Sequence, residues 1–148
     1  MRIPLTILGL SLVLATPVQA DPCGDLIDRV KAATDATLIR RTADFAEFSA
    51  KDGIGLTLAC GDLSATGAQF KGTTLPEGYF ALFGKAGHAV NGLPAEAIAE
   101  AGRTARTNAE TKRHSQIDLG KALVTCSLSS MGGAPVTICA AIDKGERT

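Results

Sequence analysis

The sequence predicts an α+β domain: a mainly antiparallel sheet made from two β-hairpins, with two helices on one face and two disulfide bonds. Three observations lead to this prediction. Two segments have the apolar spacing of amphipathic helices. Two turns that contain glycine each separate a pair of β-rich runs. The four cysteines form an even set in a chain that begins with the features of an export signal.

The first twenty residues have the features of a secretory signal peptide. Arg2 supplies the positive start, residues 3–15 are mainly apolar, and Val18 and Ala20 place the cleavage before Asp21. The apolar stretch is shorter than the roughly 20 residues that a membrane-spanning helix needs, so we expect no stable membrane anchor after cleavage. The sequence therefore predicts an exported protein, either periplasmic or secreted.

Cleavage would leave 128 of the 148 residues, a length that suits one α+β domain spanning residues 21–148. Because Arg2 belongs to the signal, this domain holds 14 of the 15 basic residues against all 15 acidic ones, a net charge near −1. This balance and the absence of tryptophan give no reason to expect nucleic acid as a partner. No motif for a metal or a cofactor is present, so the sequence predicts neither.

The N-terminal helix is predicted over residues 25–36. Its apolar residues recur at helical spacing: Leu26, Ile27, Val30 and Ala33. Acidic residues near its start favour the helix dipole. The segment that follows, residues 37–48, is predicted to be extended because threonine, isoleucine and phenylalanine are frequent in it.

The first hairpin is predicted from its turn. The dipeptide Asp52-Gly53 suits a two-residue type I′ turn. Beyond the turn, residues 54–60 alternate in the manner of a half-buried strand. In this register Phe45 lies opposite Cys60.

Residues 61–92 hold seven glycines and contain the aromatic cluster Tyr79–Phe83. A long ordered connection of this kind is often functional. The alternative, which we favour, is that the cluster forms a short strand or helix that packs on the core, because strongly apolar residues must be buried somewhere.

The second helix is predicted to begin at Pro94 and to run to about Lys112. Proline suits the first helical position, Glu96 suits the first turn, and alanine-rich sequence continues the helix. The apolar side is narrow, so this helix should lie on a surface with one line of contact. That stripe consists of Ala97, Ile98, Ala101 and Ala105.

The second hairpin is predicted from residues 117–128 and 135–142. A Gly-Gly pair between them suits a two-residue primed turn, because both residues can adopt positive φ. With the turn centred there, Cys126 lies directly opposite Cys139 at a non-hydrogen-bonded position, where Cα atoms are about 4.5 Å apart. That distance is within the reach of a disulfide.

Four cysteines allow three pairings, and the sequence alone does not formally choose among them. The hairpin register favours Cys126–Cys139, which leaves Cys23 to pair with Cys60 and to tie the first helix to a strand. In the chain-entropy model, closing these loops of about 14 and 38 residues stabilises the fold by roughly 3 and 4 kcal/mol. The spacing contains no C-x-x-C and matches no zinc pattern, so structural disulfides are the expectation.

One histidine is a candidate for catalysis. His88 lies beside the glycine-rich segment, and Tyr79 and Asp62 are its candidate partners. Neither G-x-S-x-G nor S-x-x-K occurs in the chain. His114 follows a basic pair, and we expect it to be a solvated residue at a helix end.

Two functions from different classes fit these observations. The favoured one is a non-catalytic cell-envelope protein that binds an envelope protein or a small ligand through the glycine-rich segment. Its predicted binding residues are Tyr79, Phe80, Phe83 and His88. The alternative is a small exported hydrolase that uses His88, which requires a concave pocket holding His88 and at least one carboxylate or hydroxyl.

Overall fold

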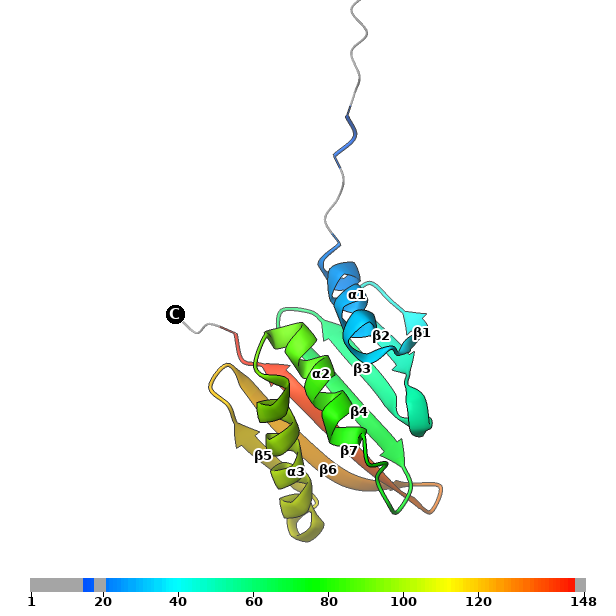
Figure 1. Cartoon of the computed structure of the whole chain (residues 1–148), viewed down its shortest axis with the longest axis vertical. Coiled ribbons are helices and arrows are strands. Elements are labelled where there is room, and N and C mark those ends of the chain that lie inside the picture. Colours follow the sequence, from blue (N-terminus) through cyan, green and yellow to red (C-terminus); the bar gives the residue numbers. More distant parts are fainter. Residues whose placement is uncertain (1–14, 18–20, 146–148) are drawn as a thin grey trace, which may run out of the picture.

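Seven antiparallel strands form one sheet, and the helices pack on one of its faces (Figure 1). The computed structural model describes residues 15–17 and 21–145. The predicted signal peptide, residues 1–20, therefore lies almost entirely outside the described residues. Among those described, no helix has the length and apolar character needed to cross a membrane. The predicted α+β class, the antiparallel sheet and the two disulfides are confirmed.

The sheet consists of two meanders that meet in the middle. Its strand order is β1-β2-β3-β4-β7-β6-β5, so the strands of each meander are neighbours and β4 pairs with β7 between them. The described elements, in chain order, are α1 (Pro22–Thr34), β1 (Thr37–Arg41), β2 (Phe45–Ser49), the 3₁₀ turn η1 (Lys51–Gly53), β3 (Gly55–Cys60), β4 (Ser64–Lys71), α2 (Tyr79–Asn91), α3 (Ala95–Lys112), β5 (His114–Asp118), β6 (Ala122–Met131) and β7 (Ala134–Asp143).

Two segments that looked continuous in the sequence contain turns. The run 37–48 forms a hairpin, in which the N–H of Thr42 donates to the carbonyl of Phe45 at 2.8 Å. The run 117–128 turns at Gly120, whose φ of 82° favours glycine. The sheet therefore has more strands than two hairpins supply.

The two predicted helices form close to their expected bounds. Helix α1 begins earlier than residue 25 because Asp21 caps it: the carboxylate accepts a hydrogen bond from the N–H of Gly24 at 2.9 Å. Helix α3 agrees with the prediction, although Ala97 is exposed and not part of its buried stripe. The buried residues of α3 are Ile98, Ala99, Ala101, Gly102, Ala105 and Ala109.

The second hairpin has the predicted register, and the first differs from it by one residue. Gly132 and Gly133 have φ of 59° and 80°, and Cys126 lies opposite Cys139 with a Cα–Cα distance of 4.1 Å. In the first hairpin Phe45 lies opposite Ala59, not Cys60. The reason is that η1 makes a three-residue loop where two residues were expected. The backbones of Ala50 and Ile54, which flank η1, bond to each other at 2.9 Å.

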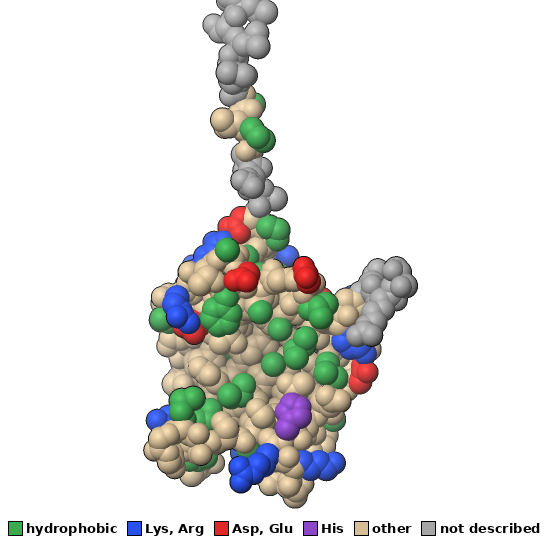
Figure 2. Space-filling model, turned by 180° about the vertical axis from the view of Figure 1, so that it is seen from behind, with side chains coloured by type: hydrophobic (Ala, Val, Ile, Leu, Met, Phe, Trp, Pro, Cys, Tyr) green, Lys and Arg blue, Asp and Glu red, His purple; other side chains and the backbone are tan. Residues whose placement is uncertain are grey.

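The core lies between the helices and one face of the sheet. The side chains that are less than 2 % exposed include Leu56 and Leu58 from β3, Val124 from β6, and Tyr79 from α2. None of the described helices covers the other face of the sheet, and Figure 2 shows that charged side chains lie mainly around its margins. The register sets small residues in a row across its centre: Thr57, Gly67, Ala140 and Thr125.

Candidate functional site

The glycine-rich segment is not a loop, because most of it forms β4 and helix α2. Tyr79 and Phe83 are 0 % exposed in the core. The Tyr79 hydroxyl donates to the carbonyl of Ala68 at 2.6 Å, and burial raises the pKa of this phenol. The favoured alternative, a short strand or helix that packs on the core, is confirmed, and the element is helix α2. In this fold neither side chain has surface to offer a ligand.

Phe80 and His88 lie on the same helix but are not brought together. Phe80 is half-buried, and His88 is exposed at the other end of α2, about 12 Å away by the helical rise. Nδ1 of His88 lies 2.8 Å from the carbonyl oxygen of Leu93. Of the two predicted partners of His88, Asp62 lies exposed in the β3–β4 turn and Tyr79 is buried at the start of α2.

Phe80 is the predicted binding residue that lines a cavity. A space of about 450 Å³ lies between α3 and the loop at residues 72–78. Its lining residues are Thr73, Thr74, Leu75, Phe80, Arg103, Arg106, Thr107 and Glu110.

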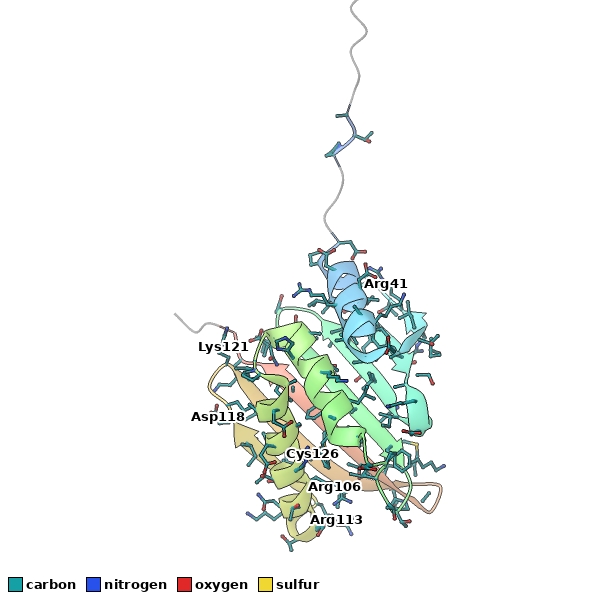
Figure 3. All side chains as sticks on the ribbon, in the orientation of Figure 1. Arg41, Arg106, Arg113, Asp118, Lys121 and Cys126 are labelled. Carbon is teal, nitrogen blue, oxygen red and sulfur yellow. A yellow bond between two sulfur atoms is a disulfide. The ribbon has the colours of Figure 1, made fainter. Side chains whose placement is uncertain are left out.

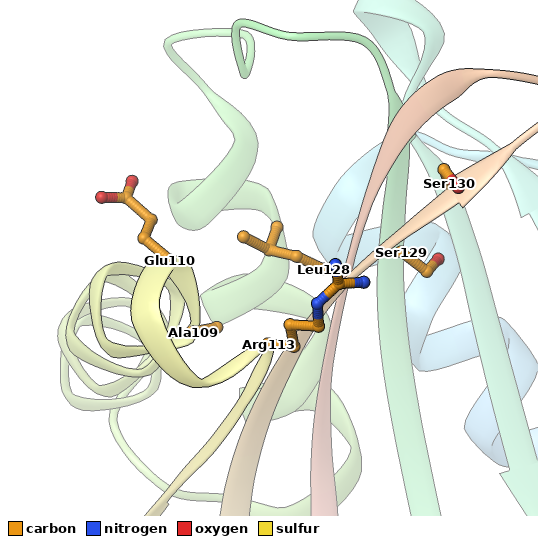
Figure 4. Close-up of a pocket in the computed structure, with 6 residues that line it drawn as sticks. All are labelled: Ala109, Glu110, Arg113, Leu128, Ser129 and Ser130. Atoms are coloured by element: carbon orange, nitrogen blue, oxygen red, sulfur yellow. The ribbon is translucent and has the colours of Figure 1, made fainter.

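A second cavity of about 320 Å³ lies further along α3, against β6 (Figure 4). Its lining residues are Ala109, Glu110, Arg113, Leu128, Ser129 and Ser130. Glu110 lines both cavities, so they adjoin. We call the thirteen residues that line them the α3 groove.

Helical periodicity explains why one side of α3 lines the groove. Residues three, four and seven positions apart share a helix face. Arg103, Arg106 and Glu110 follow this spacing, and Arg113 is the C-cap that ends the helix beside them. The buried stripe that packs on the core adjoins this side of the helix, and Ala109 belongs to both. Figure 3 shows Arg106 in the C-terminal half of α3, Arg113 directly after its end, and Cys126 on the sheet beside the helix.

Two of the three arginines in the groove are held by carboxylates. Arg103 bonds to Glu96 at 3.1 Å and to Glu100 at 3.0 Å, and these hydrogen bonds raise its pKa. Its guanidinium also lies 5.8 Å from the centre of the Phe80 ring, within the range of a cation–π interaction. Arg103 is therefore fixed both by charge and by stacking.

Arg106 is the more enclosed of the pair. Its side chain is 18 % exposed, and its Nε donates to the hydroxyl of buried Thr137 at 3.0 Å. Its second contact is an ion pair with Glu110 at 3.0 Å. The charge of Glu110, which lines both cavities, is thereby matched.

Arg113 is different, because its side chain makes no ion pair with any residue that the structure describes. Figure 4 shows its guanidinium extending from the end of α3 over β6, toward Ser129. Its backbone φ is 62°, a left-handed conformation that favours glycine. The groove thus has one guanidinium whose charge is not compensated locally.

The polar side chains of the groove suit contacts with oxygen-bearing groups. Guanidiniums and hydroxyls are good partners for carbonyl, carboxylate and phosphate oxygens. The groove has no histidine or cysteine, so it offers no pair of nucleophile and base of the usual kind. In the part of the chain that the structure describes, no group of three or more His, Cys, Asp or Glu side chains is placed to hold a metal.

Sequence reasoning missed the arginines of this groove. The charges of α3 were interpreted as a solvated helix face, which is the ordinary meaning of such a pattern. The available signal was the spacing of Arg103, Arg106 and Arg113 along one side of a helix with only a narrow apolar stripe. That spacing alone does not identify the loop and the strand that complete the groove.

Comparison with known protein families, with curated proteins and with solved structures finds no match for this chain.

Proposed function

We propose that this chain is an exported, non-catalytic binding module and that the α3 groove is its ligand site. The observation that carries the proposal is the pair of adjoining cavities, of about 450 and 320 Å³, lined by three guanidiniums and several hydroxyls. Cavities of this size with a few convergent polar groups are the usual form of a ligand site.

The groove is built on elements that packing and a disulfide hold rigid, and this rigidity favours ligand binding. Its floor rests on α3, whose Gly102 and Ala105 are buried against the core. The Cys126–Cys139 disulfide lies in the sheet directly under this helix, with Sγ of Cys126 3.3 Å from the carbonyl oxygen of Gly102. Preorganised polar groups lose little entropy when a ligand binds.

Export is supported by the cysteines and by the N-terminal sequence. Both disulfides belong to the kind of covalent staple that persists in oxidising compartments. The described residues contain no free cysteine. Together with the predicted signal at 1–20, these bridges favour the periplasm or the exterior as the place where the module acts.

The alternative of a hydrolase that uses His88 is not part of the proposal. That alternative needs a pocket around the imidazole, and His88 lines neither cavity of the α3 groove. Its Nδ1 contacts a backbone carbonyl, which fixes the ring but supplies no carboxylate.

Two threonines of α3 provide a matched test. Thr107 is exposed and lines the larger cavity, whereas Thr104 is exposed on the same helix and lines neither. We expect Thr107→Trp to fill the cavity and Thr104→Trp to leave it open, at similar cost to helix propensity. The protein starting at Asp21, with its disulfides formed, is immobilised in the wild-type and both variant forms and exposed to cell-envelope extract.

The expected result is a component that wild type and Thr104→Trp retain and that Thr107→Trp loses at least tenfold, with equal unfolding temperatures for the two variants. Retention of the same components in the same amounts by all three proteins would refute the α3 groove as the binding site. Scrambling the glycine-rich segment is unsuitable as a test, because Tyr79 and Phe83 belong to the core.

A further inference from the structure

The smaller cavity of the α3 groove has an open strand edge as one wall. The pairing of β5 with β6 ends at His114 and Ser127, whereas β6 continues to Met131. Beyond Ser127, the last residues of β6 therefore have a partner strand on the β7 side only. A sheet edge of this kind carries backbone groups that can pair with another chain.

The direction of these backbone groups follows from one hydrogen bond. The N–H of Leu128 donates to the carbonyl of Arg113 at 2.8 Å, so Leu128 directs its backbone away from β7. Strand backbones alternate with a period of two, so Ser130 directs its N–H and C=O to the same side. No residue in the described ranges pairs with Ser130 there.

Arg113 lies at the end of α3, beside this open edge of β6. The charge of Glu110, the carboxylate in the cavity, is matched by Arg106, so the Arg113 guanidinium is the charge that remains available. Arg113 also occupies the left-handed C-cap of α3, with φ of 62°, where glycine would be the less strained residue. Backbone strain of this kind occurs often at functional sites, and Arg113 combines it with a guanidinium that lines the cavity.

We propose that the α3 groove takes an extended peptide segment that carries a carboxylate. The segment lies between α3 and β6, pairs with the free backbone of Ser130 as an added strand, and places its carboxylate on Arg113. Strand addition at an open edge is a recurrent mode of peptide recognition, and arginine binds carboxylates through two parallel hydrogen bonds. The inference rests on the proposed function and names the chemistry of its ligand.

The first test uses two pools of random octapeptides, one with free and one with amidated C-termini. Both are selected on the oxidised protein starting at Asp21, and the affinity of enriched peptides is measured by fluorescence anisotropy. Enrichment in the free-terminus pool alone identifies a chain terminus as the source of the carboxylate. Enrichment of Asp or Glu in both pools identifies a side chain. Absence of any carboxylate preference overturns the proposal.

Arg113→Gly separates binding from folding. This variant removes the guanidinium and at the same time relieves the left-handed backbone, so we expect at least a tenfold loss of peptide affinity with no fall in unfolding temperature. Asp35→Gly is the matched control, since Asp35 is the left-handed C-cap of α1 with φ of 54° and lies outside the groove. It should bind as wild type does. Unchanged affinity in Arg113→Gly contradicts the proposal.

Ser130→Pro tests the added strand. Proline removes the outward N–H, and the inner pairing of β6 with β7 does not use it, so the unfolding temperature should change little. We expect at least a fivefold loss of affinity, and full affinity in this variant would exclude strand addition. If the peptides fail to bind but Thr107→Trp still loses an envelope component that Thr104→Trp retains, the binding function stands and the peptide chemistry is wrong.

Discussion

At the scale of single residues, glycines decide how closely α2 and α3 approach. A methyl group added at Gly84 would meet the backbone carbonyl of Ala95 and lie 3.2 Å from Cβ of Ala99. The carbonyl belongs to the start of α3 and cannot move away as a flexible side chain could. Helix α2 therefore contains glycine at a position where alanine would be the better helix former.

We expect Gly84→Ala to lower the free energy of unfolding by about 1–3 kcal/mol, the usual cost of an added group in a packed interface. Gly61→Ala is the control, because a methyl group at Gly61 has no neighbour within 4 Å. Its effect should stay within about 1 kcal/mol and favour the folded state. Urea denaturation of both variants measures the difference, and equal stabilities would contradict the close approach.

The same residues explain a limit of the sequence analysis. Glycine has a low helix propensity, so Gly84 and Gly87 make a helix less expected from the sequence. They are needed because α3 packs so closely against them that a side chain would not fit. The aromatic residues Tyr79 and Phe83 were enough to predict burial. They were not enough to predict that they belong to a helix of 13 residues. A contact between two helices is information that one segment of sequence does not contain.

Two exposed carboxylates should make the free energy of unfolding depend on pH in the acid range. The pKa of Asp21 is held below its ordinary value of 3.8, first by a hydrogen bond from Arg41 and then by the N–H of Gly24. The pKa of Asp118 is lowered in the same way by Lys144 and the N–H of Gly120. A carboxyl with a lower pKa in the folded state contributes stability above its unfolded pKa and loses it as the pH falls through the folded one.

We therefore expect wild type to lose stability as the pH falls below about 4, and the variant with both Asp21→Asn and Asp118→Asn to lose less. Thermal unfolding followed from pH 7 to about pH 2 measures both slopes. A double variant that loses as much as wild type over this range would show that these two pairs do not set the acid dependence.

At the scale of elements, the two hairpins show what local sequence determines. Gly132-Gly133 has φ compatible with a primed turn at both positions, and this fixes the register that places Cys126 against Cys139. The Asp52-Gly53 turn also has two positive φ values, yet its loop has three residues and the register moves by one. The hydrogen bond between Ala50 and Ile54 closes a loop of three residues. Because the side chain of Ile54 is buried, packing against the core, and not the turn sequence, sets this loop length.

The α3 groove was the least predictable part, and its composition explains why. Thr73, Phe80, Arg106 and Ser129 come from four separate segments that only the fold brings together. The aromatic cluster was a sufficient signal for the segment that contributes Phe80. The arginines gave no such signal, because an arginine on a solvated helix and an arginine lining a cavity look alike in sequence.

The two disulfides close loops of different length, so we expect them to contribute different amounts to the free energy of unfolding. Cys23–Cys60 joins α1 to the end of β3 across 37 positions, and Cys126–Cys139 joins neighbouring strands across 13. Loop closure predicts losses of about 4 and about 3 kcal/mol when each pair is replaced by alanine. Urea denaturation of the two double variants measures the losses. A larger loss from the shorter loop would show that packing around buried Cys126 and Cys139, and not chain entropy, dominates.

At the scale of the whole molecule, the predicted cleavage and the start of the fold coincide. The cleavage is expected before Asp21, and Asp21 is the residue that caps α1 and pairs with Arg41 at 2.6 Å. Processing at this point removes no group that the described fold uses.

We expect the exported protein to begin at Asp21 and to gain the mass of four hydrogen atoms on reduction, two for each disulfide. Mass spectrometry of the intact protein, with and without reductant, measures both quantities. A form that begins well after Asp21 would lack the cap of α1, and an unprocessed chain with four thiols would contradict export.

Within the described ranges, 15–17 and 21–145, the main chain is the one covalent link between the two meanders. Each bridge closes within its own part: Cys23–Cys60 ahead of α2, and Cys126–Cys139 after α3. A single cut by a protease at Gly92, which is exposed between α2 and α3, would therefore yield two pieces that no sulfur bond connects. The clipped molecule would keep its shape in buffer through the β4–β7 ladder and the helix contacts. It would separate into two bands on a denaturing gel even without reductant.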